Sequence, residues 1–69
     1  MPLIIAPLNQ ELKIIKILTD EKTKKHLESL GITINSTLKV VGNTGNIIVS
    51  VKEGRLALDK GLATKIIVA

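Results

Sequence analysis

The side chains that could carry chemistry in this chain are few and widely spaced. His26 is the only histidine, cysteine is absent, and there are six carboxylates, which are scattered along the chain. A metal site on a helix needs a second ligand three or four residues away on the same face. The residues at those distances from His26 are lysine, threonine, serine and leucine. The pattern therefore predicts no metal site and no cofactor.

The residue types that nucleophilic catalysis requires are also few. The chain offers Ser29, Ser36 and Ser50 as hydroxyl nucleophiles but only one candidate base, and no spacing marks any of them as activated. The run Gly42–Asn46 resembles a phosphate-binding loop, but it lacks the lysine and hydroxyl residue that would lead into a helix. We interpret that run as a hairpin turn and the protein as a non-enzyme.

Composition narrows the kinds of partner. The 69 residues include no Phe, Tyr or Trp, and the net charge is +4. Nine of the ten basic residues are lysines, with Arg55 as the exception. A small basic barrel that binds RNA is one hypothesis, but it needs aromatic stacking platforms or surface arginines, so no nucleic-acid partner is expected. The charge permits attraction to an acidic protein or to a membrane surface and does not choose between them.

Local patterns predict one short helix among short strands. Asp20 is a candidate N-cap, residues 21–30 form the helix, and Gly31 stands where a C′ glycine would end it. Asn35 suits a left-handed turn in the connector that follows. The remaining elements are expected as strands at 13–18, 37–41, 46–51, 55–58 and 65–68, with a two-residue turn at Glu53-Gly54 and a helical turn at 59–63.

These elements predict a mostly β domain spanning residues 1–69, in the order β–α–β–β–β–turn–β. Short strands joined by hairpins favour a small, partly open barrel. Period-2 alternation places Ile15 and Ile17 on one face of the first strand and Ile14 on the other. The expected core is aliphatic: Ile15, Ile17, Leu27, Leu30, Leu38, Val40, Val49 and Leu58.

The helix also carries the candidate partner-binding residues. Lys24, Lys25 and His26 occupy successive positions, so they spread over about 200° of the helix surface. Leu27 and Leu30 form the stripe that is expected to face the sheet, with His26 at its flank. A solvated helix face is the plain interpretation of this basic run, and docking to an acidic surface is the functional one.

Over nearly its whole length the chain resembles the FeoA family, small cytoplasmic partners of the bacterial ferrous iron transporter FeoB. The resemblance begins with Pro7-Leu8 and continues through the segment from Lys25 to Ile32, which is similar to the family's basic-Leu-x-x-Leu-Gly-Ile helix end. Aliphatic positions in the family's order and spacing complete it: Ile14, Ile17, Leu38, Val40, Ile47, Val49, Leu56, Ala57, Leu58, Ala63, Ile66 and Val68.

Three departures accompany the resemblance. Ile34-Asn35 replaces the family's Pro-Gly, residues 9–12 lack its usual glycine, and Lys24, Lys25 and His26 replace an arginine-rich helix. The resemblance implies an SH3-like barrel and a cytoplasmic accessory protein. This protein would support ferrous iron uptake by contacting the GTP-binding cytoplasmic part of a FeoB-type transporter, without inserting into the membrane. The resemblance also extends to the C-terminal domain of iron-dependent repressors. The alternative function is therefore that of a metal-binding or metal-sensing regulatory domain.

Overall fold

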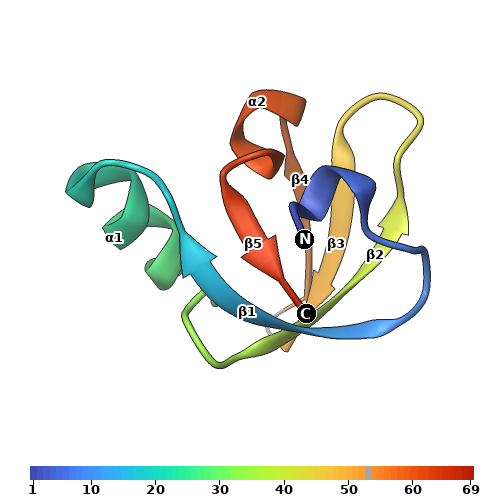
Figure 1. The fold of residues 1–69 in the computed structure, drawn as a ribbon, viewed down its shortest axis with the longest axis horizontal. Helices are drawn as coiled ribbons and strands as arrows, with labels where there is room; N and C mark the ends of the chain where they lie inside the picture. The colour runs from blue at the N-terminus through green and yellow to red at the C-terminus, as the bar shows by residue number, and fades with distance from the viewer. Residues whose placement is uncertain (53) are drawn as a thin grey trace.

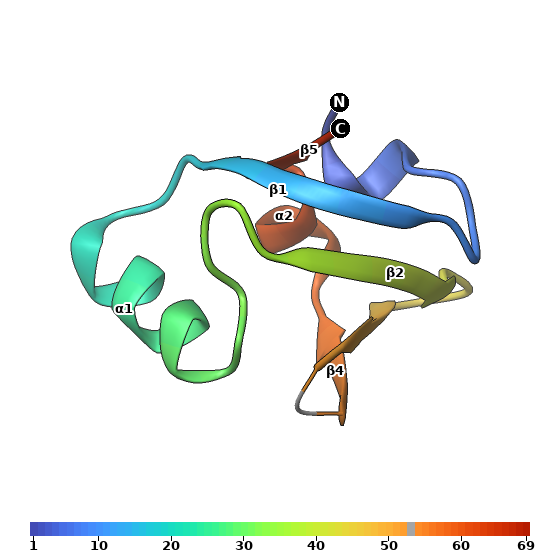
Figure 2. The ribbon, with the colours of Figure 1, turned by 90° about the horizontal axis from the view of Figure 1, so that it is seen from below.

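The computed structural model describes residues 1–52 and 54–69. They form an antiparallel five-stranded sheet in the order β4-β3-β2-β1-β5, which curls around the core and leaves β4 and β5 as its two ends (Figure 1). Figure 2 shows α1 outside the sheet, next to the C-terminal end of β1 and the N-terminal end of β2. The elements are η1 (Leu3–Ile5), β1 (Glu11–Ile17), α1 (Glu21–Ser29), β2 (Thr37–Gly42), β3 (Ile47–Val51), β4 (Gly54–Leu58), α2 (Lys60–Ala63) and β5 (Ile66–Val68).

The predicted order of elements is confirmed. The expected helical turn is α2, whose N-cap Asp59 accepts a hydrogen bond from the Leu62 backbone N–H at 2.7 Å. Gly54 has a φ of +138°, the conformation expected of it in the hairpin, while its predicted turn partner Glu53 lies outside the described residues. The 3₁₀ turn η1 was not predicted, because residues 2–8 show only an apolar run without a helical period.

The predicted face assignment of β1 was wrong at Ile15. This side chain is 41% exposed, whereas Leu12, Ile14 and Ile17 are buried. The pairing with β5 explains the change, because Ile14 is opposite Val68 and Lys16 is opposite Ile67, so Ile15 is an extra residue in the strand. A β-bulge of this kind reverses the inside–outside alternation beyond it. Ile17 consequently faces inward although Ile15 does not.

Leu30 was also wrongly assigned to the core. Helix α1 ends at Ser29, and Leu30 is the C-cap residue with φ −94° and ψ 2°. Its side chain is half-buried, and the next buried residue after Leu27 is Ile32. The helix therefore ends one residue before Leu30. The helical spacing that predicted Leu30 on the same face as Leu27 does not apply there, because the chain turns towards Gly31.

The core is aliphatic, as predicted, and six of the eight proposed members lie in it. These are Ile17, Leu27, Leu38, Val40, Val49 and Leu58. The N-terminal segment adds buried side chains that the sequence did not assign to the core, including Leu3 and Ala6. Backbone hydrogen bonds in both directions between Met1 and Val68 hold this segment against β5, where it covers the end of the sheet.

Candidate functional site

Helix α1 is fixed at both ends by local chemistry. The Asp20 carboxylate accepts a hydrogen bond from the Thr23 backbone N–H at 3.3 Å, and bonding from Thr23 lowers the pKa of Asp20 below its usual value. At the other end Gly31 has a φ of +93°, which lets the Ile32 N–H donate to the Leu27 carbonyl at 2.9 Å. This C-terminal geometry suits glycine because a Cβ is disfavoured there.

The three candidate partner-binding residues lie on this helix. Lys25 and His26 are exposed, Lys24 is half-buried, and Leu27 is the buried residue that ties the helix to the barrel. His26 is the neighbour of Leu27 along the helix, and its side chain does not share the burial of Leu27. The structure thus leaves this basic surface open to solvent at the protruding end of the molecule (Figure 1). That arrangement permits docking and solvation alike.

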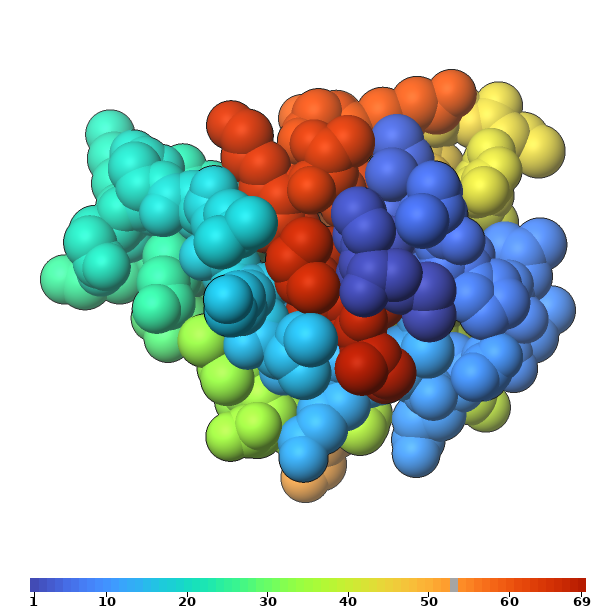
Figure 3. Space-filling view, viewed as in Figure 1, coloured from blue at the N-terminus to red at the C-terminus, as the bar shows by residue number. Residues whose placement is uncertain are grey.

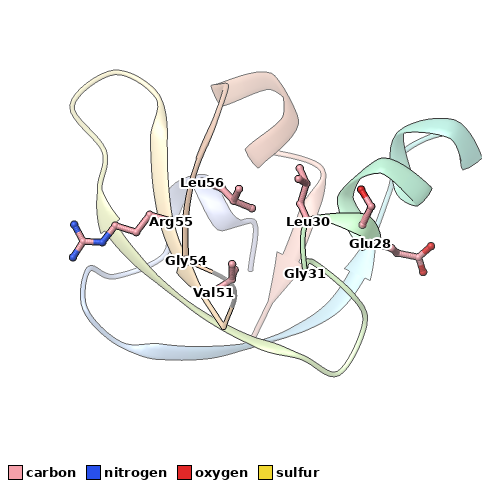
Figure 4. Close-up of a pocket in the computed structure, with 8 residues that line it drawn as sticks. Glu28, Leu30, Gly31, Val51, Gly54, Arg55 and Leu56 are labelled. Carbon is pink, nitrogen blue, oxygen red and sulfur yellow. The ribbon is translucent and has the colours of Figure 1, made fainter.

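A groove lies beside the C-terminal end of the helix. It has a volume of about 320 Å³ and separates α1 from the β3–β4 hairpin. Its residues are Glu28, Ser29, Leu30, Gly31, Val51, Gly54, Arg55 and Leu56. In Figure 4 the side chains of Leu30 and Leu56 face each other across the groove, while Arg55 and Glu28 point away from it on opposite sides. The groove thus has an aliphatic interior and charged groups at its margins.

The wall formed by β4 has a second property. This strand pairs with β3 from Val51↔Gly54 to Ile47↔Leu58 and is an end strand of the sheet. An antiparallel strand with one neighbour leaves alternate backbone N–H and C=O groups on its other edge without strand partners. An extended segment of another chain could therefore hydrogen-bond to this edge.

Sequence reasoning missed the groove. Its two walls are at least 20 residues apart in the chain, from Gly31 to Val51, and the helical period assigned Leu30 to the core. The half-burial of Leu30 and Leu56 is what marks them as groove residues in the structure. One signal was present in the sequence, since Leu30 sits next to the glycine that ends the helix, where an apolar residue need not continue the buried face.

Two carboxylates that are far apart in the sequence line another hollow. Asp20 and Asp59 line it together with Lys65, and the hollow has a volume of about 540 Å³. Each carboxylate already accepts a backbone N–H at a helix N-terminus. Within residues 1–52 and 54–69, no three His, Asp or Glu side chains are grouped so that they could hold a metal ion.

The hydroxyls of two candidate nucleophiles bond to nearby backbone. Ser29 Oγ donates to the His26 carbonyl at 2.6 Å, and Ser36 Oγ donates to the Thr33 carbonyl at 2.7 Å. Ser36 also accepts from the Thr33 N–H at 3.2 Å, which fixes the connector before β2. Asn35 in that connector has a φ of +74°, as predicted for the residue in place of a turn glycine. The hydrogen bonds of Ser29 and Ser36 thus stabilise the local backbone.

Known proteins share this arrangement. A family model described as the FeoA domain matches residues 1–69. A protein of Methanocaldococcus jannaschii named as an Fe(2+) transport protein A is 40% identical over 68 residues, covering 97% of this chain and 83% of that protein. A crystal structure of an iron uptake regulatory protein (FeoA) is 32% identical, with a TM-score of 0.87 and coverage of 99% of this chain and 92% of that one.

More distant structures share the fold alone. The solution NMR structure of a FeoA protein from Chlorobium tepidum has a TM-score of 0.89 at 20% identity and covers 99% of this chain and 68% of that one. A manganese-dependent transcriptional repressor has a TM-score of 0.83 at 21% identity, with coverage of 96% of this chain and 39% of the repressor. The same small barrel therefore recurs as part of a larger protein.

An open, aliphatic five-stranded barrel with a capped helix at one end defines a small SH3-like domain. Within that class the chain belongs to the FeoA family, which is involved in ferrous iron transport. Among the residues that the structure describes, no helix has the length and apolar character needed to cross a membrane.

Proposed function

We propose that this chain is a non-enzymatic, cytoplasmic accessory domain for ferrous iron uptake. It acts by protein–protein contact with the cytoplasmic, GTP-binding part of a FeoB-type iron transporter. Membership of the FeoA family supports the transport context. The observation that carries the contact is the groove between α1 and β4, which places an aliphatic interior next to a basic helix.

This combination suits a protein partner. Interfaces commonly have an apolar centre that excludes water and a polar rim. Here Leu30 and Leu56 would supply the centre, and the unpaired edge of β4 would supply directional hydrogen bonds. Lys24 and Lys25 would lie at the rim, where charges steer the encounter more than they hold the complex.

Replacing both Lys24 and Lys25 by glutamate is expected to slow association with the transporter's cytoplasmic part. At low salt the rate should fall on the order of tenfold, because attraction to an acidic surface becomes repulsion. The same replacement should weaken the salt dependence of the rate, since screening then has less attraction to remove. Stopped-flow or biosensor association rates at several salt concentrations measure both effects.

The matched control is the double variant Lys13→Glu/Lys39→Glu. It changes net charge by the same amount, but its two exposed lysines belong to the paired strands β1 and β2 and line no part of the groove. Its association rate should stay within about twofold of the wild type, because screening limits the reach of a surface charge to roughly 10 Å. Equal slowing in both variants would show that net charge alone matters and would remove Lys24, Lys25 and His26 from the contact.

A metal-sensing regulatory domain is the second candidate. The fold shared with a manganese-dependent repressor and the lining of one hollow by both Asp20 and Asp59 favour it. We nevertheless expect no tight ferrous iron site, because Lys65 lines the same hollow and both carboxylates cap helices. Calorimetric titration with ferrous ion under anaerobic conditions tests this expectation. A stoichiometric site of micromolar affinity would replace the accessory role by the metal-binding one.

A further inference from the structure

The outer surface of β1 and β5 carries apolar side chains that the fold does not cover. Exposed Met1, Ile5, Ile15 and Leu18 are four of the six large exposed apolar residues identified in the structure. Their segments are neighbours, because β5 pairs with β1 on one side and with Pro2 on the other. Figure 3 shows residues 1–5, 13–18 and 65–69 side by side on one face. We call this surface the β1–β5 face.

The bulge at Ile15 widens this surface. Ile14 points inward, so Ile15 points outward by ordinary alternation, and the extra residue turns Lys16 outward beside it and Ile17 inward. Half-buried Ile67 lies between Lys16 and Pro2 and continues the apolar surface across β5. Of the four exposed apolar residues, Ile15 lies in β1, whereas Met1, Ile5 and Leu18 lie in segments next to β1 and β5.

The charges on the β1–β5 face are mainly positive. Exposed Lys13, Lys16 and Lys65 come from residues 13–18 and 65–69, which contain no aspartate or glutamate, while the exposed carboxylates of Glu11 and Asp20 lie at its margin. Lysine side chains can lay their methylene stems along apolar surface while the ammonium group extends beyond it. A face of this composition complements a surface that is negatively charged outside and apolar beneath.

We propose that the β1–β5 face rests on an anionic lipid bilayer at the level of the headgroups. The lysines would contact lipid phosphates and carboxylates, and the exposed aliphatic side chains would enter the boundary between headgroups and acyl chains. The contact needs no spanning segment. It is independent of the proposed transporter contact, which uses α1 and the groove.

Two other occupants suit this face less well. A second copy would meet it through a two-fold axis, which sets the same lysines against one another, while Glu11 and Asp20 lie only at the margin of the face. A protein partner would favour aromatic residues and arginine at the centre of its contact and would disfavour lysine. The face has lysines and no arginine, and the chain has no aromatic residue. Lipid headgroups, by contrast, recognise charge without demanding bidentate geometry.

Vesicle co-sedimentation tests the proposal with the full chain and lipid alone. We expect binding to vesicles of phosphatidylcholine with about 30% phosphatidylserine at low salt, and loss of it at about 0.5 M salt. Lys13→Glu/Lys16→Glu should weaken binding at least tenfold, because two attractions become repulsions. The aliphatic contribution is tested with Ile15→Ser/Leu18→Ser, which should weaken binding severalfold even at equal charge.

The control is Lys52→Glu/Arg55→Glu, whose two exposed side chains lie on the β3–β4 hairpin, at the end of the strand order opposite to β5; it should bind these vesicles within about twofold of the wild type. Circular dichroism and the thermal midpoint establish that each variant is folded before binding is compared. Absence of wild-type binding to anionic vesicles would overturn the proposal. So would equal weakening in the control, binding only when the transporter is present in the vesicles, or sedimentation equilibrium showing that Ile15→Ser/Leu18→Ser disrupts a dimer.

Discussion

Replacing Leu27 by alanine is expected to lower the free energy of unfolding by about 2–5 kcal/mol. Leu27 is 1% exposed and is the buried residue of α1. A helix of this length is not stable alone in water, so its persistence depends on this anchor. Because small domains have only about 5–15 kcal/mol of stability, the loss should shift the urea midpoint strongly and unfold part of the population under mild heating.

Leu30→Ala is the matched control for this prediction. It removes the same atoms three residues away, but from a half-buried position at the groove. Its cost should be roughly 1 kcal/mol, because less apolar area returns to water and no closed cavity is left. Chemical denaturation of both variants, monitored by far-ultraviolet circular dichroism, gives the comparison. An unchanged midpoint for Leu27→Ala, or equal losses for the two variants, would contradict the packing described here.

Features determined by neighbours in sequence were predictable. The N-cap at Asp20, the helix end at Gly31 and the left-handed Asn35 each depend on a few consecutive residues. So does the alternation in β3, where Ile47, Val49 and Val51 are buried. The resemblance to the FeoA family rests on the same kind of local pattern, and the family comparison confirms it.

Features determined by neighbours in space were not predictable from one sequence. The bulge at Ile15 depends on how β5 aligns with β1 across about fifty residues of chain. The groove depends on where the β3–β4 hairpin stands relative to the end of α1. Hydrophobic periodicity identifies which residues prefer burial, but it cannot say which of them the tertiary arrangement leaves at a groove or on an outer face.

One part of the candidate site was predictable from the sequence and the other part was not. The exposure of Lys25 and His26 followed from the helical period, because both lie off the stripe that contains Leu27. The apolar half of the proposed docking surface did not follow, because Leu56 comes from a distant strand. A helix surface read alone therefore suggests a purely electrostatic contact, whereas the structure adds an aliphatic groove and a free strand edge beside it.

The bulge itself can be tested with two neighbouring residues. Ile14→Ala is expected to cost about 2–5 kcal/mol of unfolding free energy, because Ile14 is fully buried and its site cannot collapse readily. Ile15→Ala should cost less than about 1 kcal/mol, because its side chain is largely in solvent. Urea denaturation of the two variants, fitted with a common slope, measures the difference.

This pair is closely matched because both changes remove the same three methylene-sized groups from adjacent positions in one strand. The loss of a β-branched residue's strand preference is common to both, so their difference isolates burial. Uninterrupted alternation from Ile15 to Ile17 would reverse the order of the two losses, with Ile15→Ala the costlier. The sign of the difference decides whether Ile14 or Ile15 faces the core, and a comparably large loss for Ile17→Ala would show the bulge, because a regular strand cannot place Ile14 and Ile17 on one face. The sign also decides whether Ile15 is available on the β1–β5 face.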